Sequence, residues 1–253
     1  MSTTIHGEIF YETDWNKKST PGKYRAFTLD GREYVYPFKD TEEHATERKG
    51  TIVVSDKKIE ASDENDKIHS NIVDIYSLEG FDENLALGVR FNNDEKIYPY
   101  VSVTFVPKTL DEFLRAIDYE NTVYYGNIEL FSGARFPVNA ANKADIKKYL
   151  FSDIDVKNNL SVNPTGYKVT MSISCSELGF ENKALYIYED GHIATNLIGY
   201  KYVFFVGKEN VSDFIKMSYN VTFEELKKVN VTSASKNSAD SATTQVSMPQ
   251  VLE

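Results

Sequence analysis

The sequence has one cysteine, one tryptophan and four histidines among 253 residues, and two of these shortages exclude a class of site. A single thiol, Cys175, cannot form a disulfide within the chain. The histidines, His6, His44, His69 and His192, are scattered, so the His-Glu-x-x-His motif of helical zinc proteases is absent. The sequence therefore predicts neither a disulfide framework nor a histidine-based metal centre.

Long apolar runs are also absent. No run approaches the roughly 18 residues that a membrane-spanning helix needs, and residues 1–7 contain no apolar signal core. We expect this chain to meet a membrane only through a segment absent from it. The final Leu252-Glu253 is typical of a cloning site before a purification tag, which favours a piece of a longer protein.

Basic charge is in deficit, because 28 Lys and Arg face 38 Asp and Glu, for a formal net charge of −10. An acidic excess repels nucleic-acid phosphates and anionic lipids, so we expect no nucleic-acid partner. The hydrophobic share of 41% and the charged share of 26% are typical of a folded domain. The length allows one large domain or two small ones.

Short alternating strands and turn signals dominate what is present. Asp30-Gly31 and Asp190-Gly191 each stand between aromatic-rich or apolar runs, and Asp-Gly supplies the positive φ angles of a type I′ hairpin turn. Further strands are expected at residues 52–54, 72–76, 85–91, 96–101, 122–131, 168–174 and 201–206.

Helix signals are fewer. Thr109 with Glu112, and Thr222 with Glu225, form capping boxes ahead of apolar residues. Residues 142–150 and 208–217 are further predicted helices. Helices that interrupt hairpins irregularly predict an α+β fold, with antiparallel sheets built from hairpins and a few short capped helices.

Two polar stretches suggest boundaries. Residues 60–67 are charged, and residues 233–244 contain nothing large and apolar to bury. We therefore predict an N-terminal hairpin region at 1–66, a main α+β domain at 67–230, and a disordered tail or linker at 231–253.

The sequence contains no complete catalytic motif. Cys175 lies in an alternating run without an evident His and Asn or Asp partner, which favours a small strand residue. Ser55-Asp56-Lys57-Lys58 matches the Ser-x-x-Lys pattern, but Ser-Asp-Asn and Lys-Thr-Gly are missing, and Ser55 ends a strand-like run. Nucleophile-elbow, phosphate-loop and dinucleotide motifs are absent.

Metal ligands and paired acids give no better support. Glu42-Glu43-His44 is interpreted as a solvated charged loop. Asp63-Glu64-Asn65-Asp66 and Ser152-Asp153-Ile154-Asp155 supply carboxylates, but neither has the central glycine and closing glutamate of a calcium-binding loop. No pair of carboxylates is singled out for glycoside cleavage. We expect no enzyme activity and no cofactor, and we assign no catalytic, cofactor-binding or metal residue.

Tyrosine is abundant, with 17 residues, and several of them follow predicted strands. One interpretation is a recognition surface for a peptide or sugar; ordinary half-buried strand composition is the favoured one. The tyrosines concerned are Tyr98, Tyr100, Tyr124, Tyr125, Tyr186 and Tyr188.

Six segments within residues 72–217 carry a family resemblance: Ile75–Asp82, Ala86–Phe91, Pro107–Phe113, Gly179–Leu185, Glu189–Asn196 and Phe204–Val211. In this order they resemble the extracellular carboxy-terminal region of Clostridia-type members of the beta-lactam-sensor/antirepressor membrane metallopeptidase family. In that family the zinc site belongs to a membrane portion that is absent here, so no catalytic residue carries over.

The resemblance implies a non-enzymatic extracytoplasmic sensing or ligand-binding domain of a Gram-positive cell-surface protein, part of a membrane antirepressor sensor. It places the chain outside the cell or at its surface. The ligand is open, and a cell-envelope small molecule or a protein would suit such a domain. The alternative is a free-standing secreted or surface protein that acts through protein–protein interaction, and a hydrolase with an unrecognised acidic pair is a third interpretation.

Overall fold

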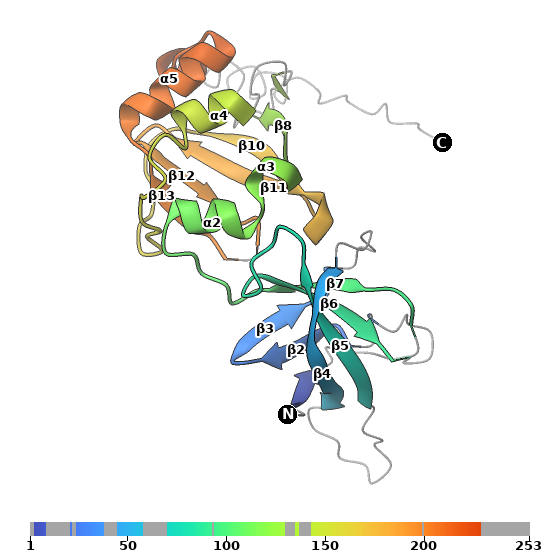
Figure 1. The fold of residues 1–253 in the computed structure, drawn as a ribbon. Helices are drawn as coiled ribbons and strands as arrows, with labels where there is room; N and C mark the ends of the chain where they lie inside the picture. Colours follow the sequence, from blue (N-terminus) through green and yellow to red (C-terminus); the bar gives the residue numbers. More distant parts are fainter. Residues whose placement is uncertain are drawn as a thin grey trace, which may run out of the picture.

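A computed structural model describes residues 3–8, 21, 24–37, 45–57, 70–92, 94–129, 135–136, 143–198 and 200–228. In this part of the chain there are two β-sheets, with the helices gathered on the second (Figure 1). The predicted α+β class, with mainly antiparallel sheets built from hairpins and a few short helices, is confirmed. The predicted tail at 231–253 lies outside the described residues.

The first sheet has the strand order β1-β4-β5-β6-β7-β3-β2. Its strands are β1 (Thr3–Glu8), β2 (Ala26–Leu29), β3 (Arg32–Val35), β4 (Ala45–Lys57), β5 (Ser70–Leu78), β6 (Ala86–Phe91) and β7 (Tyr98–Ser102). Neighbouring strands run antiparallel, apart from the parallel pair of β1 and β4. The end strands β1 and β2 lie close together, so the sheet curls on itself.

The turn between β2 and β3 has the conformation that the sequence predicts. Asp30 and Gly31 have φ angles of 51° and 77°, as a type I′ turn requires at both central positions. The hairpin pairs Ala26 with Val35 and Leu29 with Arg32. Its inner face joins an apolar core, inside the curled sheet, made of Tyr24, Phe27, Tyr34, Tyr36, Ile52, Val54, Val73, Ile75, Leu87, Val89, Phe91, Tyr98 and Tyr100.

Strand pairing does not divide the chain at the expected boundary between residues 66 and 67. That boundary separates β4 from β5, and these two strands pair from Ala45 opposite Leu78 to Ser55 opposite Ser70. The sheets change instead between β7 and β8, because the strands after β7 belong to the second sheet. We call residues 3–102 the first region and residues 103–228 the second region.

The second sheet has the strand order β13-β12-β11-β10-β8-β9, and its neighbouring strands are antiparallel. Its strands are β8 (Val123–Glu129), β9 (Arg135–Phe136), β10 (Lys168–Cys175), β11 (Phe180–Tyr188), β12 (His192–Thr195) and β13 (Tyr202–Phe205). The helices are α2 (Leu110–Ala116), α3 (Tyr119–Thr122), α4 (Lys143–Tyr149), α5 (Lys208–Tyr219) and the 3-10 turn η2 (Ser176–Leu178), followed by a helical segment at 223–228.

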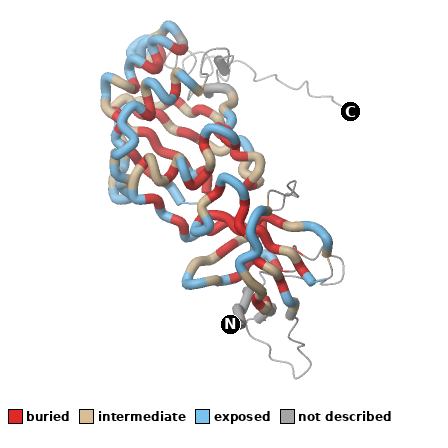
Figure 2. The backbone as a smooth tube through the Cα atoms, viewed as in Figure 1, coloured by how far each residue is buried: buried red, intermediate tan, exposed pale blue. Residues whose placement is uncertain are grey.

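The helices pack on one face of the second sheet (Figure 1). Met171 and Ile173 of β10 share a core with Phe113 of α2, Ile146 of α4 and Phe214 of α5. The same core includes side chains of the loop between β5 and β6, so buried segments continue from the second region into the first (Figure 2). The two regions are therefore joined by a common core.

Both predicted capping boxes are present. The Thr109 hydroxyl accepts a hydrogen bond from the Glu112 amide at 3.1 Å, and α2 begins at the next residue. Thr222 and Glu225 bond reciprocally, with 2.7 Å from the Thr222 amide to the Glu225 carboxylate. These contacts satisfy amides that the first turn of a helix leaves unpaired.

The second Asp-Gly hairpin forms between β11 and β12, but the type I′ prediction is wrong there. Gly191 has a φ of 95° and Asp190 has no positive φ; the Gly191 amide donates to the Tyr188 carbonyl at 3.0 Å. A Cβ atom at Gly191 would lie 2.6 Å from the Lys208 nitrogen and 2.7 Å from the carbonyl carbon of Gly207. The start of α5 therefore packs against this turn and sets its conformation.

Candidate binding groove

The candidate nucleophiles of the sequence are not placed for catalysis. Cys175 is buried at the end of β10, where its thiol contacts the Thr122 hydroxyl at 3.4 Å. Burial raises the pKa of this thiol to about 11, which disfavours the nucleophilic thiolate. Ser55 lies within β4, opposite Ser70, rather than at the start of a helix.

The histidine and acidic candidates do not meet either. His6 lies in β1, and His192 begins β12, where its Nδ1 lies 3.0 Å from Asp190. Asp153 and Asp155 form an exposed loop turn through a 3.1 Å bond from the Asp155 amide to the Asp153 carboxylate. Within the described residues no three His, Cys, Asp or Glu side chains gather as metal ligands. The stretches 42–44 and 63–66, and His69, lie outside the described residues.

The strand tyrosines divide between the two regions. Tyr98 and Tyr100 are buried inside the first sheet, so they offer no recognition surface. Tyr124 is exposed, whereas Tyr186 and Tyr188 lie on the face of the second sheet opposite the helices, with the Lys168 ammonium 4.4 Å from the Tyr186 ring centre.

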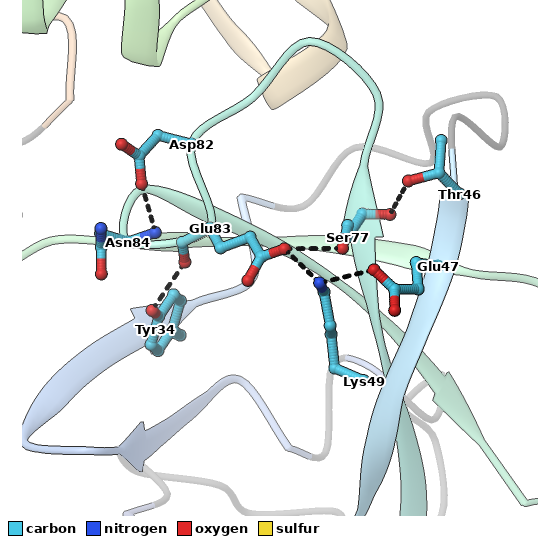
Figure 3. A network of polar contacts seen from close by, with 8 residues as sticks. All are labelled: Tyr34, Thr46, Glu47, Lys49, Ser77, Asp82, Glu83 and Asn84. Carbon is cyan, nitrogen blue, oxygen red and sulfur yellow. Dashed lines mark hydrogen bonds and ion pairs between the residues drawn. The ribbon is translucent and has the colours of Figure 1, made fainter.

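A polar network holds the loop between β5 and β6 (Figure 3). The Glu83 carboxylate accepts hydrogen bonds from Lys49 at 2.7 Å and from the Ser77 hydroxyl at 2.8 Å, and these two donors lower its pKa. The Tyr34 hydroxyl donates to the Glu83 carbonyl at 3.0 Å. From the same loop, the Asp82 amide donates to Ala116 at the end of α2. The network fixes the loop that joins the regions.

A second polar cluster lies on the outer face of the first sheet. The Asp74 carboxylate accepts hydrogen bonds from Arg48 at 2.7 Å, from Thr51 at 2.7 Å and from Arg90 at 2.8 Å. The hydrogen bond from Arg48 is the largest of the contacts that hold the pKa of Asp74 far below its usual value. Thr51 and Arg90 stand directly opposite Asp74 on the neighbouring strands. This cluster is a cross-strand contact of the kind that stabilises a sheet.

A groove of ≈ 300 Å³ lies between α2, α3 and α4 in the second region. The loop after α4 closes one side of it. Its lining consists of Asp111, Leu114 and Arg115 from α2, Asp118, Tyr119 and Glu120 at α3, Lys147 from α4, and Phe151 and Ile154 from the following loop. We call this set the α2–α4 groove.

The rims of the α2–α4 groove are charged. Arg115 pairs with Asp111 along α2, and Lys147 pairs with Glu120, so that α4 is tied to α3. Lys143 adds a hydrogen bond of 2.7 Å to the Glu120 carbonyl. Ligand groups of either charge can therefore meet a partner at the rims.

Asp118 closes the end of the groove that faces the first region. Its carboxylate accepts two hydrogen bonds from the Asn121 amide, at 2.9 and 3.0 Å, and its backbone is left-handed, with a φ of 45°. A Cβ atom at Gly80 would lie 2.4 Å from this carboxylate, and Gly80 itself has a φ of 81°. Glycine at position 80 thus lets the loop between β5 and β6 approach the groove.

The floor of the groove is apolar. Tyr119 and Phe151 are each 5% exposed and meet edge to face, with ring centres 5.3 Å apart. Rings buried to this degree offer no free face for stacking on a sugar. Ile154 is 41% exposed, and together with Leu114 it presents an aliphatic surface. The floor is therefore suited to an apolar group.

A small void of ≈ 10 Å³ lies behind this floor. It is lined by Leu110, Phe113, Leu114, Ile117, Tyr119, Tyr125, Phe151, Ile173, Leu185, Ile193, Ala194, Thr195 and Phe204. Leu114, Tyr119 and Phe151 line both the void and the groove. The wall between them is one layer of side chains thick.

Two tyrosine hydroxyls beside the void lack hydrogen-bond partners among the described residues, those of Tyr119 and Tyr125. The two hydroxyls interact, and their contact shifts the pKa of both, but the geometry between them is not that of a regular hydrogen bond. Burial raises the pKa of Tyr119 to about 12, and it raises that of Tyr125 well above the usual value. Both hydroxyls therefore stay protonated and can donate.

The lining of the groove lacks the residue types that most often serve as nucleophile or general base. Its lining contains no serine, threonine, cysteine or histidine, and two of its three carboxylates are already paired with a cation. Sequence reasoning did not find this site. Leu114 was assigned to a helix face and Tyr125 to a strand, but nothing in the sequence indicates that α3, a helix of four residues, brings Tyr119 between them.

No family model matches the chain, and neither a curated protein nor a solved structure matches it. None of the helices in the described ranges is both long and apolar enough to cross a membrane.

Proposed function

We propose that the chain is a non-enzymatic, extracytoplasmic ligand-binding or sensing domain and that its ligand binds in the α2–α4 groove. The observation that carries the proposal is the combination of an apolar floor with charged rims in one concave site, which is the usual form of a small-molecule site. The proposed location at the cell surface and the proposed role in a membrane antirepressor sensor rest on the resemblance of residues 72–217 to the extracellular region of that sensor family.

The geometry favours a ligand of mixed character. An aliphatic group would cover Leu114 and Ile154, while charged groups would reach the pairs of Arg115 and Lys147. Peptide fragments of the cell envelope combine these features, because they carry aliphatic side chains beside ammonium and carboxylate groups. We therefore place such fragments ahead of uncharged sugars.

A thermal-shift screen with soluble peptidoglycan fragments, their stem peptides and a beta-lactam antibiotic tests the proposal, followed by calorimetric titration of any hit. A ligand at 100 times its Kd stabilises the folded state by about 2.7 kcal/mol. Lys147→Glu and Ile154→Asp should each weaken binding at least about tenfold, which corresponds to ~1.4 kcal/mol. After incubation with the protein, mass spectrometry should show that the mass of the ligand is unchanged.

Lys216→Glu is the matched control, because it makes the same charge change at an exposed position of α5 that is not part of the groove lining. Its Kd should stay within about twofold of the wild-type value. Equal weakening by Lys147→Glu and Lys216→Glu would show that only net charge matters. A screen without a hit, or a ligand recovered as product, would contradict the proposal directly.

A further inference from the structure

The wall between the groove and the void is thin at Tyr119. The Tyr119 ring faces the groove lining on one side and belongs to the void lining on the other. If this ring turned toward the groove, the space that it leaves would join the void to the groove. The joined space would be lined mainly by aliphatic and aromatic side chains of the second region's core.

The closed arrangement carries a free-energy cost. Tyr119 is 95% buried in terms of its accessible surface, and its hydroxyl makes no hydrogen bond of regular geometry with the described residues. The buried Tyr125 hydroxyl makes none either, and the two hydroxyls have only each other nearby. Buried hydroxyls without a hydrogen bond are unfavourable and call for an explanation. Turning Tyr119 outward would let its hydroxyl bond to water or ligand. The free-energy difference that favours the closed state, in which the Tyr119 ring separates the void from the groove, is therefore smaller than the apolar packing of this ring alone would give.

The element that carries Tyr119 is short. The helix α3 has four residues, begins at the left-handed residue Asp118, and has no side-chain hydrogen bond at its N-cap. A single helical turn has little stability of its own and depends on its tertiary contacts. On the groove side Lys143 and Lys147 hold Glu120, and on the core side Thr122 contacts the Cys175 thiol.

We propose that Tyr119 gates a buried apolar pocket behind the α2–α4 groove, and that the pocket takes a phenyl-sized apolar group bearing one hydrogen-bonding oxygen. The size follows from the volume of the ring that moves, and the oxygen is required by Tyr125, whose hydroxyl remains inside. This inference rests on the proposed function of the groove, because it describes the part of the ligand that passes its floor.

A matched pair of fluorinated probes tests the pocket. The compounds 4-fluorophenol and 4-fluorotoluene have nearly the same shape, but only the phenol has an oxygen. Tyr119→Ala removes the gate, so fluorine NMR titration should show both probes binding at least about tenfold more tightly than to the wild type. The phenol should bind about fivefold more tightly than the toluene, and Tyr125→Phe in the same background should abolish that preference.

Tyr119→Phe keeps the ring and removes only the unpartnered hydroxyl. The closed state should become more stable, so the thermal midpoint should rise by about 2–4 °C while the affinity for 4-fluorophenol falls about fivefold. Tyr200→Phe, which removes the hydroxyl of a half-exposed tyrosine, is the control and should change neither value. A lower midpoint for Tyr119→Phe would mean that this hydroxyl has a partner and would overturn the gate.

The outcomes separate this inference from the proposed function. Neutral probes do not need the charged rims, so high salt, which screens charges, should leave their affinity for Tyr119→Ala within about twofold. Probe binding in Tyr119→Ala without any envelope hit would retain the pocket and reject the proposed ligand class. If an envelope fragment binds but neither probe binds to Tyr119→Ala, the groove is retained and the pocket is rejected. The pocket is also rejected if a bound probe leaves the methyl NMR signals of Ile173 and Leu185, which line the void, unshifted.

Discussion

The two regions differ in how they treat buried polar groups. In the first region the buried Tyr100 hydroxyl donates to the Tyr24 carbonyl at 2.7 Å, and Tyr98 donates to Asp94 at 2.6 Å. Among the described residues, four buried side-chain polar atoms lack a partner, and all four lie in the second region. They are the hydroxyls of Tyr119, Tyr125 and Ser218 and one carboxylate oxygen of Glu177.

The difference has a structural basis. The first sheet curls around its own core, so a tyrosine that crosses this core reaches backbone carbonyls at the far end. The second sheet is covered by separate short helices, and side chains that meet between them are not matched by any regular backbone pattern. Unsatisfied groups in a folded protein are expected at sites that do something besides fold. The comparison therefore supports the proposal that the ligand binds in the second region.

The largest expected effect comes from comparing the glycines of the two Asp-Gly turns. Gly31 and Gly191 both have positive φ, but a Cβ atom meets nothing within 4 Å at Gly31, whereas it meets the backbone of Gly207 and Lys208 at Gly191. Gly31→Ala should cost about 1 kcal/mol of unfolding free energy from backbone strain alone. Gly191→Ala adds the clash and should cost about 3 kcal/mol or more.

Urea unfolding of the two variants measures this difference. Equal slopes with shifted midpoints would show that stability alone has changed. Equal losses of unfolding free energy in Gly31→Ala and Gly191→Ala would mean that the start of α5 does not restrict the turn between β11 and β12. The hairpin of the second region would then be no more constrained than that of the first.

The same two turns show what sequence can and cannot predict. Both hairpins follow from Asp-Gly between apolar runs, because the signal is local. The conformation of the turn is local only at Asp30-Gly31. At Asp190-Gly191 it depends on α5, which arrives from residues 207–208, and no local pattern contains that contact.

Tertiary convergence also explains why the groove was missed. The helix after Thr109 was predictable from its cap and apolar spacing, and so was the helix at 142–150. The groove arises where these helices meet α3, whose four residues are too few to show a period. The parallel pairing of β1 with β4 was likewise not predictable, because it joins segments some fifty residues apart.

A matched pair of buried tyrosines provides the next test of the comparison. Tyr100→Phe removes a hydroxyl that is bonded to the Tyr24 carbonyl, so it should lower the unfolding free energy by about 1–2 kcal/mol. The corresponding change at Tyr119 should have the opposite sign. Chemical unfolding of both variants under one condition checks the signs. If both lowered stability alike, satisfaction of polar groups would not distinguish the regions.

The smallest effect concerns the outer face of the first sheet. Hydrogen bonds, first from Arg48 and then from Arg90, lower the pKa of Asp74 in the folded state. A carboxylate with a lowered folded-state pKa contributes stability above its unfolded pKa of about 3.9, and this contribution is lost as the pH falls toward the folded-state value. Because Arg48 and Arg90 are half-exposed, the contribution should be about 1 kcal/mol or less.

Asp74→Asn should therefore lower the thermal midpoint of unfolding at pH 7, and the gap from the wild type should shrink steadily below about pH 4. Asp213→Asn, at an exposed carboxylate of α5, is the control and should track the wild type across this range. High salt should narrow the gap at pH 7, since exposed ion pairs are screened. A gap that stays constant down to pH 2 would attribute the loss to altered packing. The first region would then owe its stability to its apolar interior, and its satisfied surface charges would no longer distinguish it from the second.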